Sequence, residues 1–255
     1  MGDLRPNTQK RYLTSLRQLH GHFAGLGIAH VSPATVNAYT VARKQAGVTG
    51  ATIRRDLMVA GRVLKAARRA GWIQHNPVPD EMEEIRERRE PIRPVPLKEL
   101  ARMTHRAPPG FKELLRFLAR TGCRQEEAAS LEWSQLELGA KPKCTFFRTK
   151  TRSPRVIPLP PRLARDLRQM PRTGAHVFIS AQGERYKNVS GLFRRMLVLA
   201  GVSEEKRFRC HDLRHTYAIR SLQSGRPIYE LARHLGHSSV KTTERYAAWL
   251  SRPPT

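Results

Sequence analysis

HDLRHTYAIR (211–220) and LGHSSVKTTERYAAWL (235–250) are the stretches on which the interpretation of this chain depends. In the first, His211 and Arg214 are three residues apart, so a helix would place an imidazole and a guanidinium on one face. In the second, a Gly-His corner and a serine cap at 238 or 239 precede a helix that presents Tyr246. Each pattern alone is weak, because a tyrosine can equally belong to a helix core.

Two further stretches upstream carry chemically useful side chains. In TGCRQEEAASLEW (121–133), Arg124 follows a Thr-Gly turn and opens a helix. Glu127 lies three residues further on the same face and can hold the guanidinium, although an ordinary surface ion pair has the same spacing. CTFFRTK (144–150) and RVIPL (155–159) are typical of two short strands in a hairpin with Lys150 near its tip.

The first half of the chain has helical periodicity. Apolar residues three and four apart predict one helix that ends before Gly25. Ser32 is placed to cap a second helix, and a third is expected from Thr49 to Gly71. The expected apolar faces consist of Tyr12, Leu16, Leu19, Phe23, Val36, Tyr39, Ile53, Leu57, Val63 and Leu64.

A stretch with five prolines and a dense charge run, residues 76–96, is typical of a solvated linker. The chain is therefore predicted to be mainly α-helical with two domains: a helical domain over 1–80, a linker over 81–96 and an α+β domain with a small antiparallel sheet over 97–255. In the second domain we expect helices over 97–106, 111–120 and 161–170, a short strand over 176–180, and several helices up to Trp249.

Charge points to a polyanionic partner. The chain has 255 residues, and 47 Lys and Arg against 21 Asp and Glu give a net charge of +26, of which +7 falls in 1–90 and +19 in 91–255. Lysine and arginine that neutralise phosphates release counterions, which favours nucleic acid as the partner. No stretch is apolar enough for a membrane helix or a signal peptide. Three widely spaced cysteines indicate reduced thiols, so a cytoplasmic protein is expected.

The acidic residues do not favour metal-dependent cleavage. They are scattered, without the clustered carboxylates of a two-metal nuclease, and no phosphate-binding loop for ATP is present. Cys210, His211 and His215 have the spacing of zinc ligands, but the residue after His211 is Asp212 rather than the glutamate of the zinc protease motif, so zinc is not favoured. Metal-free phosphoryl transfer assisted by cationic side chains is the remaining chemistry.

Taken in order, TGCRQEE, TKTRSPRVIPL, HDLRHTYA and LGHSSVKTTERY resemble the tyrosine recombinase (phage integrase) family. The resemblance covers nearly the whole chain, because the first half is similar to the helical, SAM-like core-binding domain of that family. It implies a catalytic set with Glu127 as a supporting acid and with no cofactor or metal. The members of that set are Arg124, Lys150, His211, Arg214, His237 and Tyr246.

The resemblance also implies the reaction. Tyr246 would attack the scissile phosphate to form a 3′-phosphotyrosine, with His211 as the acceptor of its proton, and Lys150 would protonate the departing 5′ oxygen. Arg124 and Arg214 would bind the non-bridging oxygens. His237 would add a third donor to the phosphate. Neither metal nor ATP would be needed.

The assembly implied is a homotetramer on two sites in double-stranded DNA, which exchanges strands through a Holliday junction and is a monomer when free. A mobile element of prokaryotic or phage origin and association with the nucleoid are expected. Only nine residues follow Tyr246, so a short or absent C-terminal docking helix is expected. A type IB topoisomerase and a non-catalytic DNA-binding protein stay open. Candidate DNA contacts in the first half are Arg43, Lys44, Arg54 and Arg55.

Overall fold

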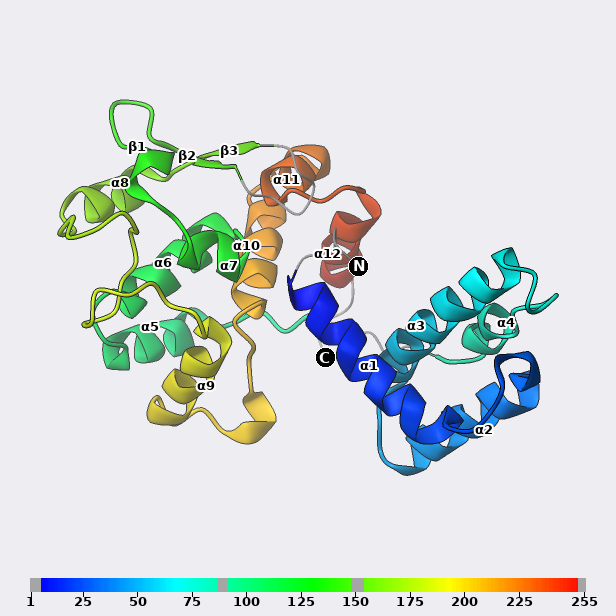
Figure 1. The fold of residues 1–255 in the computed structure, drawn as a ribbon. Helices are drawn as coiled ribbons and strands as arrows, with labels where there is room; N and C mark the ends of the chain where they lie inside the picture. The colour runs from blue at the N-terminus through cyan, green and yellow to red at the C-terminus, as the bar shows by residue number, and fades with distance from the viewer. Residues whose placement is uncertain (1–5, 87–90, 148–153, 252–255) are drawn as a thin grey trace. The chain divides into compact units, whose positions relative to one another are not determined.

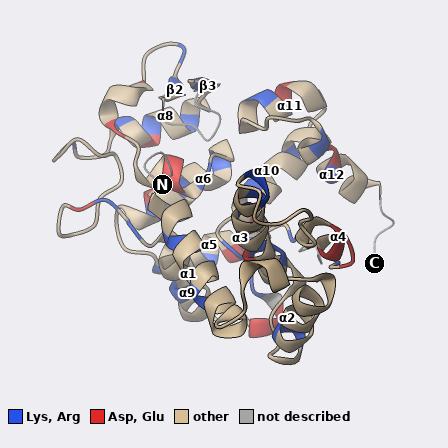
Figure 2. Cartoon of the chain, turned by 45° about the vertical axis from the view of Figure 1, so that its right-hand side comes forward, with Lys and Arg blue, Asp and Glu red and all other residues tan. Residues whose placement is uncertain are grey.

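The computed structural model describes residues 6–86, 91–147 and 154–251. The chain divides into two compact units, Met1–Glu90 and Pro91–Thr255, each with its own hydrophobic core (Figure 1). Lysine and arginine lie along the helices of both units and outnumber the acidic residues (Figure 2). None of the helices in the described part of the chain combines the length and apolar content that a bilayer-spanning segment needs.

The first unit is all-helical, as the sequence predicts. The side chain of Ser32 accepts a hydrogen bond from the backbone N–H of Thr35 at 3.3 Å, and the Thr35 hydroxyl accepts one from the backbone N–H of Ser32 at 2.9 Å. This reciprocal cap fixes the start of the second helix. The elements of the unit are α1 (Pro6–Phe23), η1 (Ile28–His30), α2 (Pro33–Gln45), α3 (Gly50–Arg69) and α4 (Val78–Glu83).

The expected apolar faces form most of the core of this unit. The side chains that are buried as predicted are Leu19, Val36, Tyr39, Ile53, Leu57 and Leu64. Val63 is the exception, with 46% of its surface exposed. Its neighbour on α3, Leu64, is buried at 4% exposure.

A buried carboxylate ties three helices of the first unit together. Asp56 on α3 is 1% exposed and accepts hydrogen bonds from the hydroxyls of Ser15 at 2.7 Å and Tyr39 at 3.1 Å. It also pairs with Arg11 at 3.1 Å and Arg43 at 3.3 Å. The partners come from α1 and α2, so this one side chain replaces apolar packing at the centre of the unit.

Most of the stretch that the sequence analysis expects to be a linker is described in the structure. The two units divide between residues 90 and 91, within the expected range 81–96. However, α4 extends into that range, and Ile85 and Val95 are buried at 3% and 1% exposure. The isolated apolar residues of this charged stretch therefore pack on the cores at either side instead of facing water.

The second unit combines helices with a three-stranded antiparallel sheet of order β1-β2-β3, which confirms the predicted α+β fold. Cys144 pairs with Ile157 at its centre, and both are fully buried. The elements are α5 (Leu97–Arg106), α6 (Phe111–Thr121), α7 (Gln125–Ala129), η2 (Trp133–Gln135), β1 (Leu136–Glu137), β2 (Lys143–Phe146), β3 (Arg155–Pro158), α8 (Pro161–Arg168), α9 (Val189–Leu199), η3 (Glu204–Lys206), α10 (Asp212–Gln223), α11 (Ile228–Leu235) and α12 (Lys241–Leu250).

The expected strand over 176–180 is absent from this sheet. That segment makes only isolated bridges, His176 with Glu132 and Ile179 with Arg185. Val177 and Phe178 are nevertheless buried at 2% and 0% exposure. The apolar run therefore reflects burial in the core and not strand pairing, two causes that a short apolar stretch does not distinguish.

Candidate active site

The loop between α6 and α7 presents the first of the predicted arginines. Gly122 ends α6 with φ of 63°, and a Cβ there would overlap the ring of Tyr217. The chain then turns so that Arg124 precedes α7. Its guanidinium donates to Glu127 Oε1 at 2.9 Å, and its backbone N–H donates to Oε2 at 2.8 Å. The predicted contact between the two side chains is therefore present.

Glu127 is shared with a second arginine that was not predicted. Arg155, at the start of β3, donates from Nη2 to Glu127 Oε2 at 2.6 Å, and the two side chains are only 8% and 6% exposed. Burial alone would raise the pKa of Glu127. The charge of Arg155 and the hydrogen bonds from Arg124 overcome that effect and lower the pKa, so the carboxylate is ionised.

Arg214 on α10 completes a cluster of three guanidinium groups around the C-terminal end of α11. It is 3% exposed and donates to the carbonyls of Gly122 at 2.9 Å and Leu235 at 2.7 Å. The Leu235 carbonyl also accepts from Arg155 at 2.7 Å, and the Gly236 carbonyl accepts from Arg124 at 2.9 Å. Burial and the neighbouring charge of Arg124 lower the pKa of Arg214 to about 10.

Tyr246 lies on α12, as predicted, and is 3% exposed. Its hydroxyl oxygen lies 2.9 Å from Nδ1 of His215 on α10. Burial raises the pKa of Tyr246, although the positive charges of Arg214 and Arg245 partly oppose that shift. The nucleophile expected from the sequence is thus protonated and paired with a histidine at neutral pH.

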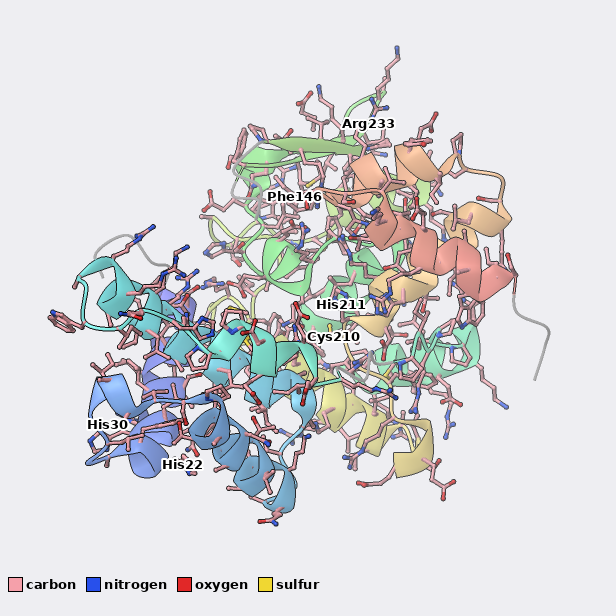
Figure 3. The ribbon with its side chains drawn as sticks, turned by 90° about the vertical axis from the view of Figure 1, so that its right-hand side faces the viewer. His22, His30, Phe146, Cys210, His211 and Arg233 are labelled. Atoms are coloured by element: carbon pink, nitrogen blue, oxygen red, sulfur yellow. The ribbon has the colours of Figure 1, made fainter. Side chains whose placement is uncertain are left out.

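Each of the two predicted histidines lies near one member of this pair, His211 near His215 and His237 near Tyr246. His211, labelled in Figure 3, stands directly before α10. Its ring is edge-on to that of His215 at a centroid distance of 4.7 Å. The ring of His237 stacks toward Tyr246 at 6.5 Å, and its Nδ1 lies 2.8 Å from the hydroxyl of Thr243. Burial and the nearby charges of Arg214 and Arg124 lower the pKa of His237 to about 4.

Most of the predicted catalytic set is therefore connected by contacts within one region of the second unit, while Lys150 lies outside the described residues. Two features of the site are not predicted from the sequence: the pairing of Arg155 with Glu127 and the contact of His215 with Tyr246. Arg155 begins the predicted strand RVIPL, where alternation places it on the same face as buried Ile157. His215 was considered only as a zinc ligand, although its i, i+4 spacing from His211 puts both on one face.

The described residues contain no group of three or more His, Cys, Asp or Glu side chains arranged to hold a metal ion. The zinc arrangement considered for Cys210, His211 and His215 is thus not found there. Cys210 is 5% exposed, and Cys123 is 3% exposed. Burial raises the pKa of each of these two thiols to about 12, which is typical of packed, unreactive cysteines.

The candidate DNA contacts of the first unit divide into two kinds. Arg43 pairs with Asp56, and Arg54 donates to the carbonyl of Ile85 at 3.2 Å, so both contribute to the packing of the unit. Lys44 and Arg55 are exposed.

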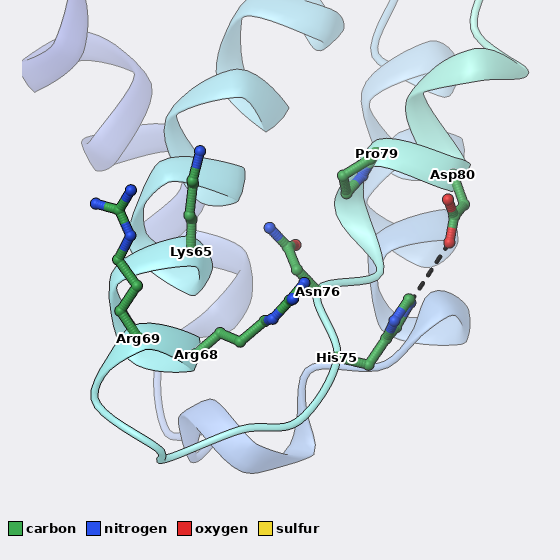
Figure 4. A pocket seen from close by; sticks show the side chains of 7 residues that line it. All are labelled: Lys65, Arg68, Arg69, His75, Asn76, Pro79 and Asp80. Atoms are coloured by element: carbon green, nitrogen blue, oxygen red, sulfur yellow. Dashed lines mark ion pairs between the residues drawn. The ribbon is translucent and has the colours of Figure 1, made fainter.

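A shallow hollow near the C-terminal end of α3 presents further cations. Figure 4 shows Lys65, Arg68 and Arg69 beside the ion pair of His75 and Asp80, whose nitrogen and oxygen lie 3.4 Å apart. Nothing in the sequence distinguishes these side chains from an ordinary charged helix end, which is usually a solvated surface.

Comparison with known proteins agrees with this geometry. The pattern of the phage integrase family matches residues 95–251, which include the four boxes quoted from the sequence. The chain belongs to the phage integrase family. This assignment confirms the family predicted from the order of the boxes.

Single relatives are similar to this chain over only part of their length. The integrase of Escherichia phage 186 is 34% identical over 139 residues, which cover 54% of this chain and 38% of that protein. The tyrosine recombinase XerD of Mycobacterium tuberculosis is 30% identical over 152 residues, 53% of this chain and 46% of that protein. The chain thus matches less than half of the length of each.

The fold is also similar to that of a solved member. This chain superimposes on a chain of a lambda integrase tetramer bound to a Holliday junction with a TM-score of 0.82. The match covers 99% of this chain and 75% of that chain, at 17% sequence identity. At that identity the likeness concerns the fold.

Proposed function

We propose that this chain is a site-specific DNA recombinase that cuts and rejoins strands through a 3′-phosphotyrosine intermediate. The observation that carries the proposal is the buried Tyr246 beside a cluster of arginines held in fixed positions by Glu127 and by backbone carbonyls. Such a cluster can neutralise the charge that develops on a phosphate during transfer, so no metal is required.

The roles follow from the side chains. Arg124 and Arg214 bind the non-bridging oxygens, since a guanidinium donates two parallel hydrogen bonds to a phosphate. His211 and His237 are further donors to the same group. Lys150 protonates the departing 5′ oxygen, because an ammonium gives up a proton more easily than a guanidinium does.

The partner proposed is double-stranded DNA at a specific recombination site. Two findings support it: the relatives are called integrase and tyrosine recombinase, and the lambda integrase of similar fold is a tetramer on a Holliday junction. We accordingly propose a monomer when free and a homotetramer on two DNA sites, formed at the nucleoid. The helical unit near 1–80 would serve as the core-binding domain, with Lys44 and Arg55 on the DNA.

The test is covalent capture. The protein is incubated with a library of nicked duplexes of randomised sequence, and complexes that survive SDS are digested and analysed by mass spectrometry and sequencing. We expect a nucleotide-linked peptide that contains Tyr246 and a defined DNA sequence. The adduct should disappear in Tyr246→Phe and persist in Tyr229→Phe, whose tyrosine is 72% exposed on α11. An adduct that survives Tyr246→Phe refutes the assignment of the nucleophile.

The alternatives open from the sequence are separated with the recovered site. A type IB topoisomerase would relax supercoiled plasmid without exchanging strands between two sites. A non-catalytic binding protein would form no adduct, and Arg124→Ala and Arg214→Ala would leave its DNA binding and biological activity intact.

A further inference from the structure

The contact of Tyr246 with His215 concerns a step that the family resemblance assigns to another residue. The hydroxyl oxygen of Tyr246 is 2.9 Å from Nδ1 of His215, and the two residues are 3% and 9% exposed. Their rings are 5.5 Å apart at 55°. The contact joins α12 to α10 and is shielded from bulk water, so water does not compete for the hydroxyl proton.

The direction of this hydrogen bond depends on the protonation state and the tautomer of His215. Burial, followed by the neighbouring His211, lowers the pKa of His215 to about 4, so the imidazole is neutral at pH 7. Asp212 opposes that shift, and Arg209 and Arg245 add to it. The hydroxyl of Tyr246 keeps its proton. A neutral imidazole with its hydrogen on Nε2 accepts this hydrogen bond at Nδ1, whereas one with its hydrogen on Nδ1 would donate it, so the tautomer decides the direction.

A carboxylate faces the other side of the same ring. Nε2 of His215 lies 3.9 Å from Oδ1 of Asp212, which is 1% exposed. Asp212 is itself fixed, because its Oδ2 accepts from the backbone N–H of Arg209 at 2.6 Å and its Oδ1 accepts from the Arg209 guanidinium at 3.0 Å. The distance to His215 exceeds that of a hydrogen bond, but the charge favours the Nε2–H tautomer and stabilises an imidazolium.

We propose that His215 accepts the proton of Tyr246 during attack on the phosphate, with Asp212 as the residue that orients and stabilises it. The order Asp212, His215, Tyr246 is that of a nucleophile activated by an adjacent base, which a third group holds in place. The proposal rests on the proposed function. It replaces His211, whose side chain is exposed and whose ring contacts that of His215 edge-on.

The step is balanced. The phenolic oxygen of Tyr246 forms a bond to phosphorus as its proton moves to Nδ1 of His215. The bond from phosphorus to the 5′ oxygen breaks, and that oxygen takes a proton from the general acid. In resealing, the 5′ oxygen attacks phosphorus as its proton passes to the deprotonated general acid. The bond from phosphorus to the phenolic oxygen breaks, and His215 returns its proton to Tyr246. A bound phosphodiester adds a negative charge to the region, which raises the proton affinity of the imidazole at the moment of transfer.

The decisive variant is His215→Asn, because the asparagine amide lies near the position of Nδ1 and accepts a hydrogen bond but cannot take up a proton. The measurement is the single-turnover rate of adduct formation on the nicked duplex recovered by covalent capture. We expect the rate to fall by about 100-fold or more, with DNA affinity unchanged. The residual rate should rise with pH as hydroxide replaces the missing base. A rate within threefold of wild type overturns the proposal, since a merely positioning histidine would be replaced by the amide.

Two controls make the result specific. His234→Gln alters another buried histidine, which lies 2.8 Å from the Thr121 carbonyl rather than near Tyr246, and should leave the rate unchanged. A duplex with sulfur in place of the bridging 5′ oxygen needs no acid for its leaving group, so it should not rescue His215→Asn. Rescue would assign His215 to leaving-group protonation and overturn the proposal.

A measurement on the wild-type protein is independent of the variant's folding and of DNA. Nitrogen-15 spectra of labelled histidine should show His215 with a hydrogen-bonded, unprotonated Nδ1 and a protonated Nε2. A hydrogen on Nδ1 contradicts the proposal. If the wild-type protein forms no adduct at Tyr246 on any duplex, the proposed function itself fails; if it forms one that His215→Asn forms equally fast, only the assignment of His215 fails.

Discussion

Replacing Arg155 by methionine should destabilise the second unit by about 3–5 kcal/mol, the usual cost of removing one partner from a buried ion pair. The guanidinium makes two short hydrogen bonds, 2.6 Å to Glu127 and 2.7 Å to the Leu235 carbonyl. A hydrogen bond to a charged group contributes about 1.5–3 kcal/mol. Because Arg214 still donates to Leu235 in the variant, most of the loss comes from Glu127. Methionine keeps an unbranched apolar side chain but lacks the guanidinium group, whose central carbon lies 5.0 Å from the centre of the Phe146 ring.

The assay is urea unfolding followed by circular dichroism, for the wild type, Arg155→Met, Glu127→Gln and the double variant. The side chains of Arg155 and Glu127 are 8% and 6% exposed, so solvent screens their interaction little. The double variant should therefore be more stable than the sum of the single losses predicts, by at least about 1 kcal/mol. A loss below about 1 kcal/mol for Arg155→Met, or additive losses, would refute the view that Arg155 holds Glu127 in place.

Three further outcomes are expected. Burial lowers the pKa of His234 to about 4 from about 6.5 in the unfolded chain, so between these pH values only the unfolded state binds this proton. The free energy of unfolding is therefore highest above about pH 6.5 and falls by up to about 1.4 kcal/mol per pH unit toward about pH 4. In urea titrations His234→Phe should show a shallower decline, and an equal slope contradicts the assignment. Asp56→Ala should destabilise the first unit by about 3–5 kcal/mol in thermal unfolding, because it leaves Arg43 and two hydroxyls without their buried partner; a change below about 1 kcal/mol is inconsistent with this. Cys123 and Cys210, with pKa values raised to about 12 by burial, should resist iodoacetamide at pH 8 until the protein is unfolded, and rapid labelling of the native protein would disprove their burial.

Local signals in the sequence predict the helices well because the cause is local. Ser32 followed by Pro33 marks the start of α2, and the capping hydrogen bonds within that turn are the reason. The prediction of a strand over 176–180 was wrong because the apolar residues of this segment pack in a core built from distant parts of the chain. For example, the backbone N–H of Val177 donates to the Leu131 carbonyl at 2.8 Å. A contact of that kind has no signature in the five residues themselves.

The contacts of the site likewise divide into local ones, which the sequence predicts, and long-range ones, which it does not. Arg124 and Glu127 are three residues apart, so helix geometry alone predicts their contact. The partners of Arg155 and His215 are not predictable in this manner, since 28 residues separate Arg155 from Glu127 and 31 separate His215 from Tyr246. Family boxes indicate which side chains gather but not which atoms meet, and the proton acceptor depends on the atoms.

The charge balance of the cluster explains why such a site would favour a phosphate. Arg124, Arg155 and Arg214 carry three positive charges, and Glu127 supplies one negative charge. The carbonyls at the end of α11 add only partial negative charge, at the negative end of the helix dipole. Burial and the positive charge of Arg124 together lower the pKa of Arg214 to about 10, so the net positive charge disfavours the charged form of this guanidinium. An anion that enters the cluster would reduce this repulsion, so part of the free-energy cost of assembling the three guanidinium groups would be offset by anion binding.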